Sequence, residues 1–551
     1  MANKLKIMPL GGLNEIGKNI TVFEYGKDII VVDCGVGFPE DDMYGVDLVI
    51  PDFSYLAANR ERIRGLFLTH GHEDHIGAVP FAMREFRAPI HATRLTAGLV
   101  RLKLEEHKLN GSVKLYTHEA GDTVQAGCFQ VEFIRVNHSI ADAVAFAIHS
   151  PIGTVLMTGD FKIDAAAPGG MIDLGRIGQL GKEGVLALLC DSTNVENPGY
   201  SSSEQSVAEG FDRQFKGCSQ RIIVTTFASN AYRLQSLFNV AHRYGRKVAV
   251  TGRSIENVLK VSMDLGYLKV PQGTLVDVSE IKSLPKNKVV IVSTGSQGEN
   301  MSALYRIAFS MHKPVELQLG DRVIISASAI PGNEKSISKI INGLYLKGAD
   351  VVYDKSADLH ASGHACQEEL KILHGLVKPK YFLPVHGEQR HLHAHAKLAQ
   401  QMGMQPKNIF IPDIGHVYEL TRTTCKLVGS VPAGKVLVDG TGVGDVGNVV
   451  LGDRRHLAQD GMLVVIINLS TEDRSIVTGP EIITRGFVYV KESEELIEEL
   501  RAIAANAVLQ CRKRRIRDLS AIRMAVKNDV TSYLFRTSKR NPMVLPVLNE
   551  V

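Results

Sequence analysis

The sequence lacks the cysteine pairs that would indicate a disulfide framework or a cysteine-ligated zinc site. Its 7 cysteines are scattered, and none of them is spaced as Cys-x-x-Cys. An odd number of isolated thiols is typical of buried cysteines in a reducing compartment.

Long apolar runs are also missing. No segment approaches the roughly 18 residues of a membrane span, and the start Met1-Ala2-Asn3-Lys4 lacks the apolar core of a signal peptide. We therefore expect a cytoplasmic protein without membrane association.

The 551 residues of the chain are too many for one core, so two or three domains are expected. The net charge of only +4 says little about partners.

Positive charge is nevertheless concentrated at the C-terminal end. Residues 501–551 contain 11 Lys and Arg against 3 Asp and Glu, centred on Arg512-Lys513-Arg514-Arg515 and Arg517. Several glutamates between 492 and 499 precede this run. On one helix over 491–515, acid at the start and base at the end would suit the helix macrodipole. A solvated, dipole-matched helix and a nucleic-acid-binding patch explain this pattern equally well.

The most informative stretch is Thr69-His70-Gly71-His72-Glu73-Asp74-His75-Ile76-Gly77. It follows an apolar run, 65–68, that we interpret as a buried strand. Neutral imidazoles and carboxylates are the ligands of zinc sites that stay open to water. His70 and His72 project together, whereas Asp74 and His75 lie past the bend. The stretch therefore predicts two adjacent metals; a polar turn with scattered histidines is the less favoured alternative.

Other predicted strands also end in histidine or aspartate. The residues that follow strands at 130–136, 154–158, 185–190 and 381–383 are His138, Asp160, Asp191 and His386. Open α/β sheets place ligand groups at the carboxyl ends of strands. Asp160 could bridge two metals with its two oxygens. Asp33, after a strand at 28–32, is either a partner that orients a ligand histidine or a turn-forming aspartate.

Strands and helices alternate regularly from about 205 to 370. The strands are expected at 221–225, 247–250, 288–292 and 322–326. This alternation predicts a parallel sheet covered by helices, inserted as a second α/β domain into the first. Its small polar loops, 227–230, 294–298 and 329–333, can cradle phosphates, although any α/β fold turns with similar loops.

Histidines are also frequent after the inserted domain. His360-Ala361-Ser362-Gly363-His364 opens a predicted helix, where it could bind a phosphate and supply a proton; surface histidines at a polar helix start are the alternative. His391, His393 and His395 follow one another at two-residue spacing, and we expect them at the surface of a helix.

The C-terminal part predicts a small α+β domain. Strands are expected at 462–467 and 486–490, followed by the helix at 491–515. The Gly-rich segment 440–447 has no clear strand–turn–helix around it, so we interpret it as a connecting segment.

Taken together, the HxHxDH pattern with His138, Asp160 and His386 resembles the metallo-β-lactamase superfamily. Asp191, His364 and His386 around an insertion are similar to its nucleic-acid-processing β-CASP branch. Residues 9–17, the His360–His364 stretch and the C-terminal domain resemble the bacterial ribonuclease J family nearly end to end. The resemblance implies an α/β fold: a metallo-β-lactamase αββα sandwich (1–204 and 371–425), a β-CASP insert (205–370), a linker (426–450) and an α+β C-terminal domain (451–551).

The resemblance also implies roles for individual residues. One zinc would be held by His70, His72, His138 and Asp160, and a second by Asp74, His75, Asp160 and His386, with manganese as the alternative metal. Asp74, Asp191 and His364 would be catalytic. RNA phosphates would contact His360, Ala361, Ser362, Gly363 and His364, and a 5′-monophosphate pocket would include Ser229 and Asn230. A structural calcium ion would lie at Asp47 and Asp439.

The implied activity is a two-metal ribonuclease that hydrolyses RNA phosphodiesters, as a 5′-to-3′ exonuclease with endonuclease activity in rRNA maturation and mRNA decay. Its substrate would be single-stranded, 5′-monophosphorylated RNA. The resemblance implies a homodimer or homotetramer, or an assembly with a paralogous subunit. Two alternatives stay open: a β-CASP nuclease that acts on DNA, and an RNA-binding scaffold of a decay complex in which catalysis is secondary. The insert disfavours a small-molecule hydrolase, because it would cover an open site with a phosphate-lined channel.

Overall fold

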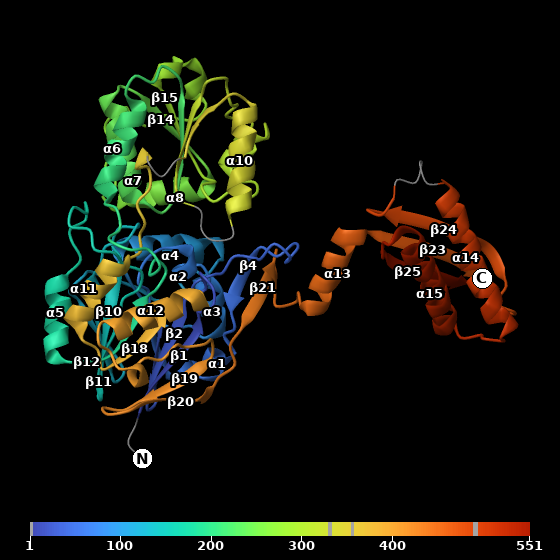
Figure 1. The fold of residues 1–551 in the computed structure, drawn as a ribbon, viewed down its shortest axis with the longest axis horizontal. Coiled ribbons are helices and arrows are strands. Elements are labelled where there is room, and N and C mark those ends of the chain that lie inside the picture. The colour runs from blue at the N-terminus through green and yellow to red at the C-terminus, as the bar shows by residue number, and fades with distance from the viewer. Residues whose placement is uncertain (1–3, 329–332, 354–356, 489–493) are drawn as a thin grey trace. The chain divides into compact units, whose positions relative to one another are not determined.

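A computed structural model describes residues 4–328, 333–353, 357–488 and 494–551. The chain forms two compact units, Met1–Gly37 with Ile50–Lys435, and Phe38–Val49 with Val436–Val551 (Figure 1). Within the described ranges, every helix is too short or too polar to span a lipid bilayer.

Two sheets form the centre of the first unit. The eight-stranded sheet has the order β20-β19-β1-β2-β3-β5-β6-β7, and the six-stranded sheet has the order β18-β12-β11-β10-β9-β8. The strands of the larger sheet are β1 (Leu5–Gly11), β2 (Ile20–Tyr25), β3 (Asp28–Val32), β5 (Ile63–Phe67), β6 (Ile90–Thr93), β7 (Leu115–His118), β19 (His416–Leu420) and β20 (Cys425–Ser430). Those of the smaller sheet are β8 (Thr123–Ala126), β9 (Phe129–Arg135), β10 (Val144–Ser150), β11 (Gly153–Met157), β12 (Val185–Asp191) and β18 (Tyr381–Val385).

The two sheets pack face to face with helices outside them. Phe23 and Phe67 of the larger sheet share a buried core with Phe133 and Phe146 of the smaller one. The outer face of the smaller sheet packs against α5, α11 and α12, and α4 contacts β6 and β7 of the larger sheet. This arrangement is the predicted αββα sandwich. Its helices are α1 (Ser54–Ala58), α2 (Glu73–Ile76), α3 (Val79–Glu85), α4 (Arg94–Glu106), α5 (Leu174–Glu183), α11 (Gln367–Val377) and α12 (Gln389–Gln401).

The strand pattern follows from burial. All five residues of β3 are buried, as expected for a strand covered on both faces. In β9, by contrast, Phe129, Val131 and Phe133 are buried while Gln130 is exposed, because alternate side chains of a strand point to opposite faces.

Parallel pairing brings several strand ends to one edge. β11 runs parallel to β12, and β12 runs parallel to β18, with Asp191 opposite Val385. In the other sheet β3 and β5 are also parallel, with Val32 opposite Phe67. The residues that follow these strands therefore lie together.

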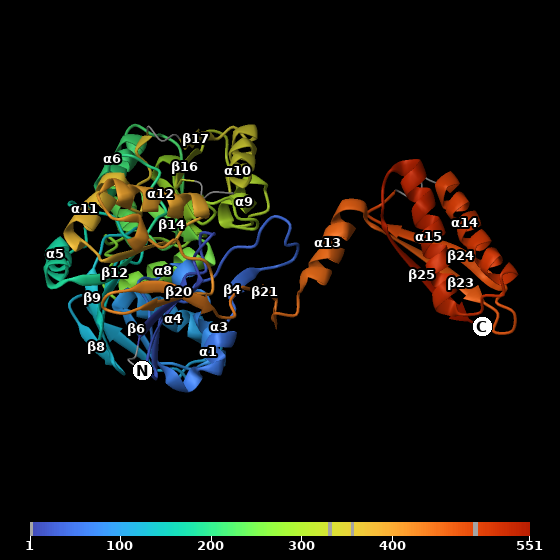
Figure 2. The same cartoon turned by 60° about the horizontal axis from the view of Figure 1, so that its bottom comes forward.

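The insert is a five-stranded parallel sheet in the order β14-β15-β13-β16-β17 (Figures 1 and 2). Helices α6, α7 and α8 pack on one face, and α9 and α10 pack on the other. The sequence predicts four of its strands and misses the short β17. Its elements are β13 (Ile222–Thr226), β14 (Lys247–Thr251), β15 (Val289–Ser293), β16 (Arg322–Ser326), β17 (Asp350–Val352), α6 (Glu204–Phe215), α7 (Ala231–Arg243), α8 (Arg253–Asp264), α9 (Ala303–Ala308) and α10 (Glu334–Leu346).

The second unit contains a three-stranded sheet, β24-β23-β25, with α14 and α15 on one face. Its elements are α13 (Asn448–Asp460), β23 (Met462–Leu469), β24 (Ile476–Arg485), α14 (Glu494–Lys513), α15 (Leu519–Ser538) and β25 (Met543–Glu550). The strand predicted at 486–490 was wrong for 486–488, because the pairing with β23 ends at Arg485; Tyr489 and Val490 lie outside the described residues.

The predicted linker, 426–450, contains regular structure. β21 (Lys435–Asp439) and β22 (Gly442–Val443) form a small sheet with β4 (Leu48–Pro51), and Val46, Val49, Leu437 and Val446 make a separate apolar cluster. The predicted domain boundaries themselves stay predictions.

Candidate metal centre and catalytic site

The histidine-rich stretch turns sharply after β5. His72 has an extended backbone and precedes α2, a single turn that carries Asp74 and His75. This turn lies directly against the loop after β3, because residue 35 is glycine: a Cβ there would lie 1.6 Å from the Asp74 carbonyl oxygen. The bend separates the two pairs of side chains, as the sequence predicts.

Four side chains converge in a first group: His70, His72, His138 and Asp160. His72 Nδ1 lies 3.0 Å from both His70 Nε2 and His138 Nε2. Asp160 Oδ2 lies 3.6 Å from His70 Nε2 and 3.7 Å from His138 Nε2. Three imidazole nitrogens and a carboxylate oxygen around one point form a donor set that suits zinc.

A second group contains Asp74, His75, Asp160 and His386. His75 Nε2 lies 3.3 Å from Asp160 Oδ2 and 3.6 Å from Asp74 Oδ2, and His386 Nε2 lies 3.3 Å from Asp74 Oδ2. Asp160 belongs to both groups. Its Oδ1 is buried and forms no hydrogen bond within the described part of the chain, although His386 Nδ1 lies 3.2 Å away as an ion-pair partner. Burying several carboxylates and imidazoles around one point is costly, and a bound cation would offset that cost. The residues therefore fit a pair of metal ions.

The electrostatics of the groups agree with this fit. Burial lowers the pKa of the His72 imidazole to about 4 and lowers the pKa values of His70 and His138 well below their usual range. These three imidazoles are therefore neutral, the form that binds metals. Burial would also lower the pKa of His386, but Asp160, Asp191 and Asp74 outweigh it and raise that pKa to about 10. Asp160, Asp74 and Asp33 likewise raise the pKa of His75. In the metal-free protein, protons on these two histidines neutralise the carboxylates.

Further groups hold the candidate ligands in place. Asp33 Oδ2 lies 2.8 Å from His75 Nδ1 and also accepts a hydrogen bond from the Thr69 hydroxyl. Asp33 therefore orients His75, as one of the two interpretations of the sequence expects. The backbones of Asp33 and His386 have φ values of 61° and 55°. For residues other than glycine this left-handed conformation costs about 1–2 kcal/mol, and such strain is concentrated at functional sites.

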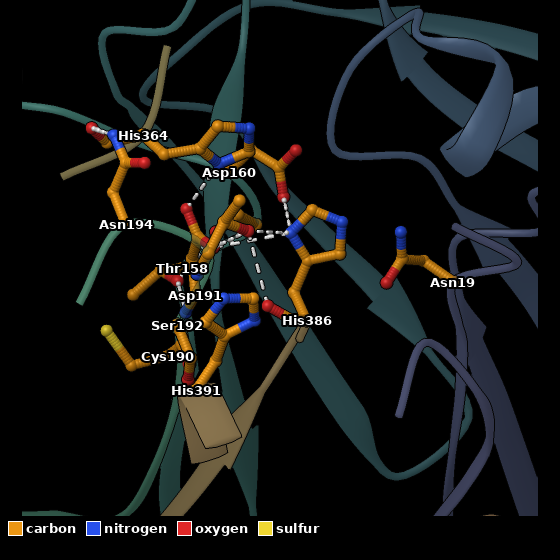
Figure 3. A network of polar contacts seen from close by, with 12 residues as sticks. Asn19, Thr158, Asp160, Cys190, Asp191, Ser192, Asn194, His364, His386 and His391 are labelled. Atoms are coloured by element: carbon orange, nitrogen blue, oxygen red, sulfur yellow. Dashed lines mark hydrogen bonds and ion pairs between the residues drawn. The ribbon is translucent and has the colours of Figure 1, made fainter. Parts of the chain in front are cut away.

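A third group places Asp191 and His364 beside the metal ligands. His364 Nδ1 lies 2.7 Å from Asp191 Oδ2, and His386 Nδ1 lies 3.3 Å from Asp191 Oδ1. Figure 3 shows His364 and His386 turned toward the two aspartates. Although burial works in the opposite direction, His364 and His386 keep the pKa of Asp191 well below its usual range. Burial would lower the pKa of His364, but Asp191 and then Asp160 outweigh it and raise that pKa, which favours the protonated imidazole.

The His360–His364 stretch is fixed from the sandwich and from the insert. Gly363 O accepts a hydrogen bond from His138 Nδ1 at 2.7 Å, and a Cβ on residue 363 would lie 2.5 Å from the His138 ring. Asn194 Nδ2 donates to Ser362 Oγ at 2.8 Å. The loop therefore needs glycine at 363, because its backbone lies directly on a candidate ligand.

Sequence reasoning missed a buried ion pair that holds the same loop. Arg233 donates to Glu204 Oε1 at 2.7 Å, to Ala361 O at 3.1 Å and to Ser326 O at 2.8 Å. Both charged side chains are buried. The two residues are 29 positions apart in the sequence and 128 positions separate Arg233 from Ala361, so no local pattern connects them.

The two residues predicted for a 5′-monophosphate pocket differ in environment. Asn230 is fully buried: its Oδ1 accepts from Arg233 N as the cap of α7, and its Nδ2 donates to Glu204 Oε1. Ser229 is only half-buried. Of this pair, Ser229 alone has a side chain available to a ligand. The third predicted phosphate loop, 329–333, lies outside the described residues except for Asn333.

The prediction that His391, His393 and His395 are surface residues was wrong for two of them. His391 and His395 are buried, while His393 is exposed. His395 Nδ1 lies 2.9 Å from Ser192 Oγ, and its Nε2 lies 3.1 Å from His374 Nε2. The four-residue separation of His391 and His395, which places both on one helix face, could have predicted this.

The residues predicted to bind calcium are engaged by other donors. Asp47 Oδ2 accepts from Gly440 N at 2.8 Å, and Asp439 pairs with Arg454 Nη2 at 2.6 Å. Neither belongs to a group of three or more candidate ligands within the described ranges.

Comparisons with known proteins agree with this geometry. Family models match at residues 13–182 (metallo-beta-lactamase superfamily), 219–344 (ribonuclease J, beta-CASP domain), 351–412 (Zn-dependent metallo-hydrolase RNA specificity domain) and 449–551 (ribonuclease J C-terminal domain). A solved structure of a protein of unknown function from Enterococcus faecalis shares the fold, with a TM-score of 0.53 at 15% identity over 76% of this chain and 100% of that chain.

Full-length relatives are also similar. Ribonuclease J of Thermus thermophilus is 45% identical over 99% of this chain and 95% of its own length. Ribonuclease J 1 of Streptococcus pyogenes is 43% identical over 99% and 98%, and ribonuclease J2 of Bacillus subtilis is 40% identical over 99% of both chains.

The fold and the site thus define a metal-dependent ribonuclease with a metallo-β-lactamase sandwich and a β-CASP insert. Within that class, the chain belongs to the ribonuclease J family, which the match over nearly its whole length shows.

Proposed function

We propose that this ribonuclease uses two metal ions and degrades single-stranded RNA from a 5′-monophosphate end, as a 5′-to-3′ exonuclease that also cleaves internally. The observation that carries the proposal is Asp160, whose carboxylate belongs to both ligand groups and lies beside the Asp191–His364 pair. A site that places two cation positions next to a proton donor suits hydrolysis of a phosphodiester.

The first ion, zinc with manganese as the alternative, would bind to His70, His72, His138 and Asp160. The second would bind to Asp74, His75, Asp160 and His386. When bound, the ions lower the pKa of a coordinated water and neutralise charge on the phosphoryl oxygens.

The other site residues bind the RNA and move protons. Asp191 holds His364 through Nδ1 and raises its pKa, so that Nε2 would donate a proton to the leaving 3′ oxygen. Asp74 and Asp191 would orient the attacking water. The backbone and side chains of the His360–His364 stretch would contact the phosphates next to the cleaved bond, with Ser362 fixed by Asn194.

The 5′-end preference would come from the insert. The half-buried Ser229 precedes α7, where helix N-terminal N–H groups favour an anion. Asn230, which caps α7 and is bonded to Glu204, would hold that loop in shape.

Matched oligonucleotides test the proposal. RNA with a 5′-monophosphate, a 5′-triphosphate or a 5′-hydroxyl, and DNA of the same sequence, would be incubated with chelator and after addition of zinc or manganese. We expect metal-dependent release of mononucleotides from the 5′-monophosphate RNA, with slower internal cleavage of the others. Equal exonuclease rates on all 5′ ends would contradict the end preference, and equal rates on DNA would favour the DNA-nuclease alternative.

Elemental analysis of the active enzyme should return two ions per chain.

Self-association is proposed for the second unit. The face of its sheet that α14 and α15 leave uncovered carries Val464 opposite Ile483 and Leu545, and next to them Ile466 opposite Val547. Leu545 and Val547 are 43% and 41% exposed, and apolar faces of this kind mark interfaces. We expect a homodimer, or a homotetramer built from it, through this face. Sedimentation of Leu545→Glu should give monomers, and an unchanged sedimentation coefficient would refute the assignment.

The proposed cellular site is the cytoplasm. All seven cysteines are free, which suits a reducing compartment. Membership of the ribonuclease J family is the basis for two further proposals. These are an assembly with a paralogous subunit, and roles in rRNA maturation and mRNA decay.

A further inference from the structure

The turn between α14 and α15 carries a cluster of exposed cations that no function described above uses. We call it the basic hairpin tip: Lys513, Arg514, Arg515, Arg517 and Arg523. All five side chains are exposed. The two helices run in opposite directions and pack together on the sheet, so the turn lies at one end of the pair (Figure 1).

Backbone hydrogen bonds fix the shape of this turn. Arg515 N donates to Arg512 O at 2.9 Å, and Ile516 N donates to Cys511 O at 3.0 Å. Ile516 is half-buried and packs on the apolar core of the unit. Ile516 therefore holds the turn against the apolar core, and the charged side chains are exposed to solvent.

The acidic residues beside the tip are engaged elsewhere. Arg512, just before the tip, pairs with Asp473, and Asp518 accepts from Ala521 N as the cap of α15. Within the described part of the chain, none of the five tip side chains forms an ion pair with a carboxylate. Unpaired like charges repel one another, so the tip costs folding stability and does not contribute to it.

The helix macrodipole explains only part of the tip. Cations on the last turn of α14 are favourable, but Arg517 precedes the cap of α15 and Arg523 lies in its second turn, where the positive end of the dipole disfavours cations. A dipole-matched helix therefore does not account for these two arginines. These two arginines therefore favour the other interpretation of the sequence, a nucleic-acid-binding patch.

Arg515 also occupies a backbone position that suits glycine. Its φ is 57°, in the left-handed region, and helices commonly end with glycine in this conformation. The sequence thus keeps a guanidinium at a place where its backbone is strained. Strain and repulsion at the same turn are expected where the charge itself has a use.

We propose that the basic hairpin tip binds the phosphate backbone of RNA, as a second, sequence-independent contact separate from the catalytic cleft. The enzyme's substrate is a polyanion, and arginine matches phosphate oxygens with two parallel N–H groups. The binding energy would come largely from release of counterions, so it would depend strongly on salt.

The opposite end of the same helix pair supplies a matched control. Lys539 ends α15 with a φ of 58°, so it shares the strained conformation of Arg515. Arg536 and Arg540 lie beside it, but the N-terminal turns of α14, rich in glutamate, are close by, since Tyr533 donates to Glu499. Within the described ranges these three cations form no ion pair with a carboxylate either, but they lie over the rings of Tyr533, Phe535 and Phe487 and have the glutamates of α14 nearby.

Binding of the full-length chain to a 30-nucleotide single-stranded RNA would be measured by fluorescence anisotropy across a KCl series, with chelator present to prevent cleavage. Arg515→Gly should raise Kd about 2- to 5-fold and lower the slope of log Kd against log[KCl] by about 0.7, the effect of one phosphate contact on a single strand. Its Tm should not fall, because glycine relieves the strained φ. Lys539→Gly should leave both Kd and slope unchanged.

A triple variant, Arg514→Gln with Arg517→Gln and Arg523→Gln, extends the test. Its slope should fall by about 2, three contacts at about 0.7 each, and its Kd at 100 mM KCl should rise about 10-fold or more. The control triple, Arg536→Gln with Lys539→Gln and Arg540→Gln, removes the same charge and should bind within twofold of wild type. Equal effects of the two triples would overturn the proposal. A changed sedimentation coefficient of the tip triple would overturn it as well, because the tip would then contact another copy of the chain.

Discussion

The sandwich and its insert both end parallel strands in polar residues, but with different chemistry. In the sandwich the residues at or just after the strand ends are carboxylates and imidazoles, such as Asp160, Asp191 and His386. In the insert the strands end in hydroxyls, such as Thr226, Ser293 and Ser326. The insert hydroxyls mostly bond to neighbouring backbone, as Ser326 Oγ does to Leu359 O at 2.6 Å. The same topological position therefore becomes a cation site or a neutral edge according to its side chains.

The difference also concerns stability. Buried hydroxyls that donate to carbonyls cost little, whereas the metal-free sandwich must bury several carboxylates beside imidazoles. Its pKa values are displaced in both directions, with His72 lowered to about 4 and His386 raised to about 10. We therefore expect substitutions at the sandwich edge to change activity and metal content, and those in the insert to change mainly stability.

The largest effect is expected at the shared carboxylate. Asp160→Ala should lower the cleavage rate by at least about 10³-fold, because several kcal/mol of charge stabilisation are lost and each 1.36 kcal/mol is tenfold. Elemental analysis should show that both ions are lost or reduced, and circular dichroism should show a folded chain. Full metal content with normal cleavage would show that the edge is not a metal centre. His72→Ala should affect mainly the first ion.

The second effect is expected at His364, the proposed proton donor. His364→Ala should lower the single-turnover rate by about 10²–10⁴-fold, the usual contribution of general acid catalysis, with metal content unchanged. Asp191→Asn should act in the same direction, because it removes the carboxylate that raises the pKa of His364. Loss of metal from His364→Ala would instead make this histidine a ligand.

The third effect lies in the insert. Arg233→Met should lower the free energy of unfolding by about 3–5 kcal/mol, because it leaves the buried Glu204 carboxylate without its partner. The double variant Arg233→Met with Glu204→Gln should recover part of that loss, as measured by thermal unfolding. The matched control is Arg213→Gln, whose pair with Asp358 is exposed; it should change stability by less than about 0.5 kcal/mol. Equal losses in both single variants would contradict this account.

The fourth effect is a pH dependence confined to the sandwich. The pKa of His386 is raised to about 10 in the metal-free protein, from about 6.5 in an unfolded chain. Its protonation therefore contributes full stability below about pH 6.5, and this contribution is lost as pH rises toward about 10.

Thermal unfolding in chelator should follow that loss between pH 6.5 and 10. His386→Gln, which cannot titrate, should show a flatter profile, and bound metal should flatten the wild-type profile by replacing the protons. Identical profiles for wild type and variant in chelator would show that His386 is not protonated in the folded state.

The smallest effect is expected at an insert strand end. Ser293 Oγ is buried and has no hydrogen-bond partner within the described residues. Ser293→Ala should leave stability unchanged or raise it by up to about 1 kcal/mol, because it removes an unsatisfied polar group. Thermal unfolding measures this, and a clear loss of stability would mean that the hydroxyl has a bound partner.

Local sequence patterns predicted the candidate ligands at the strand ends and the parallel sheet of the insert, whereas the αββα sandwich was implied by the family resemblance. Alternating and apolar runs located most strands, and the residues after β5, β9, β11, β12 and β18 were the ones that the structure brings together. Local rules suffice here, because strand periodicity and the position of a side chain after a strand are properties of a few neighbouring residues.

Which distant groups meet could be learned only from the packed fold. It paired His364 with Asp191 across 173 positions and placed Arg233 on the His360–His364 loop. It also buried His395 against His374 and placed the cations from Lys513 to Arg523 on a hairpin tip, where they form no ion pair with a carboxylate among the described residues. These contacts depend on how sheets and helices pack, and packing energy is shared among residues too far apart in the chain for any local pattern to reveal them.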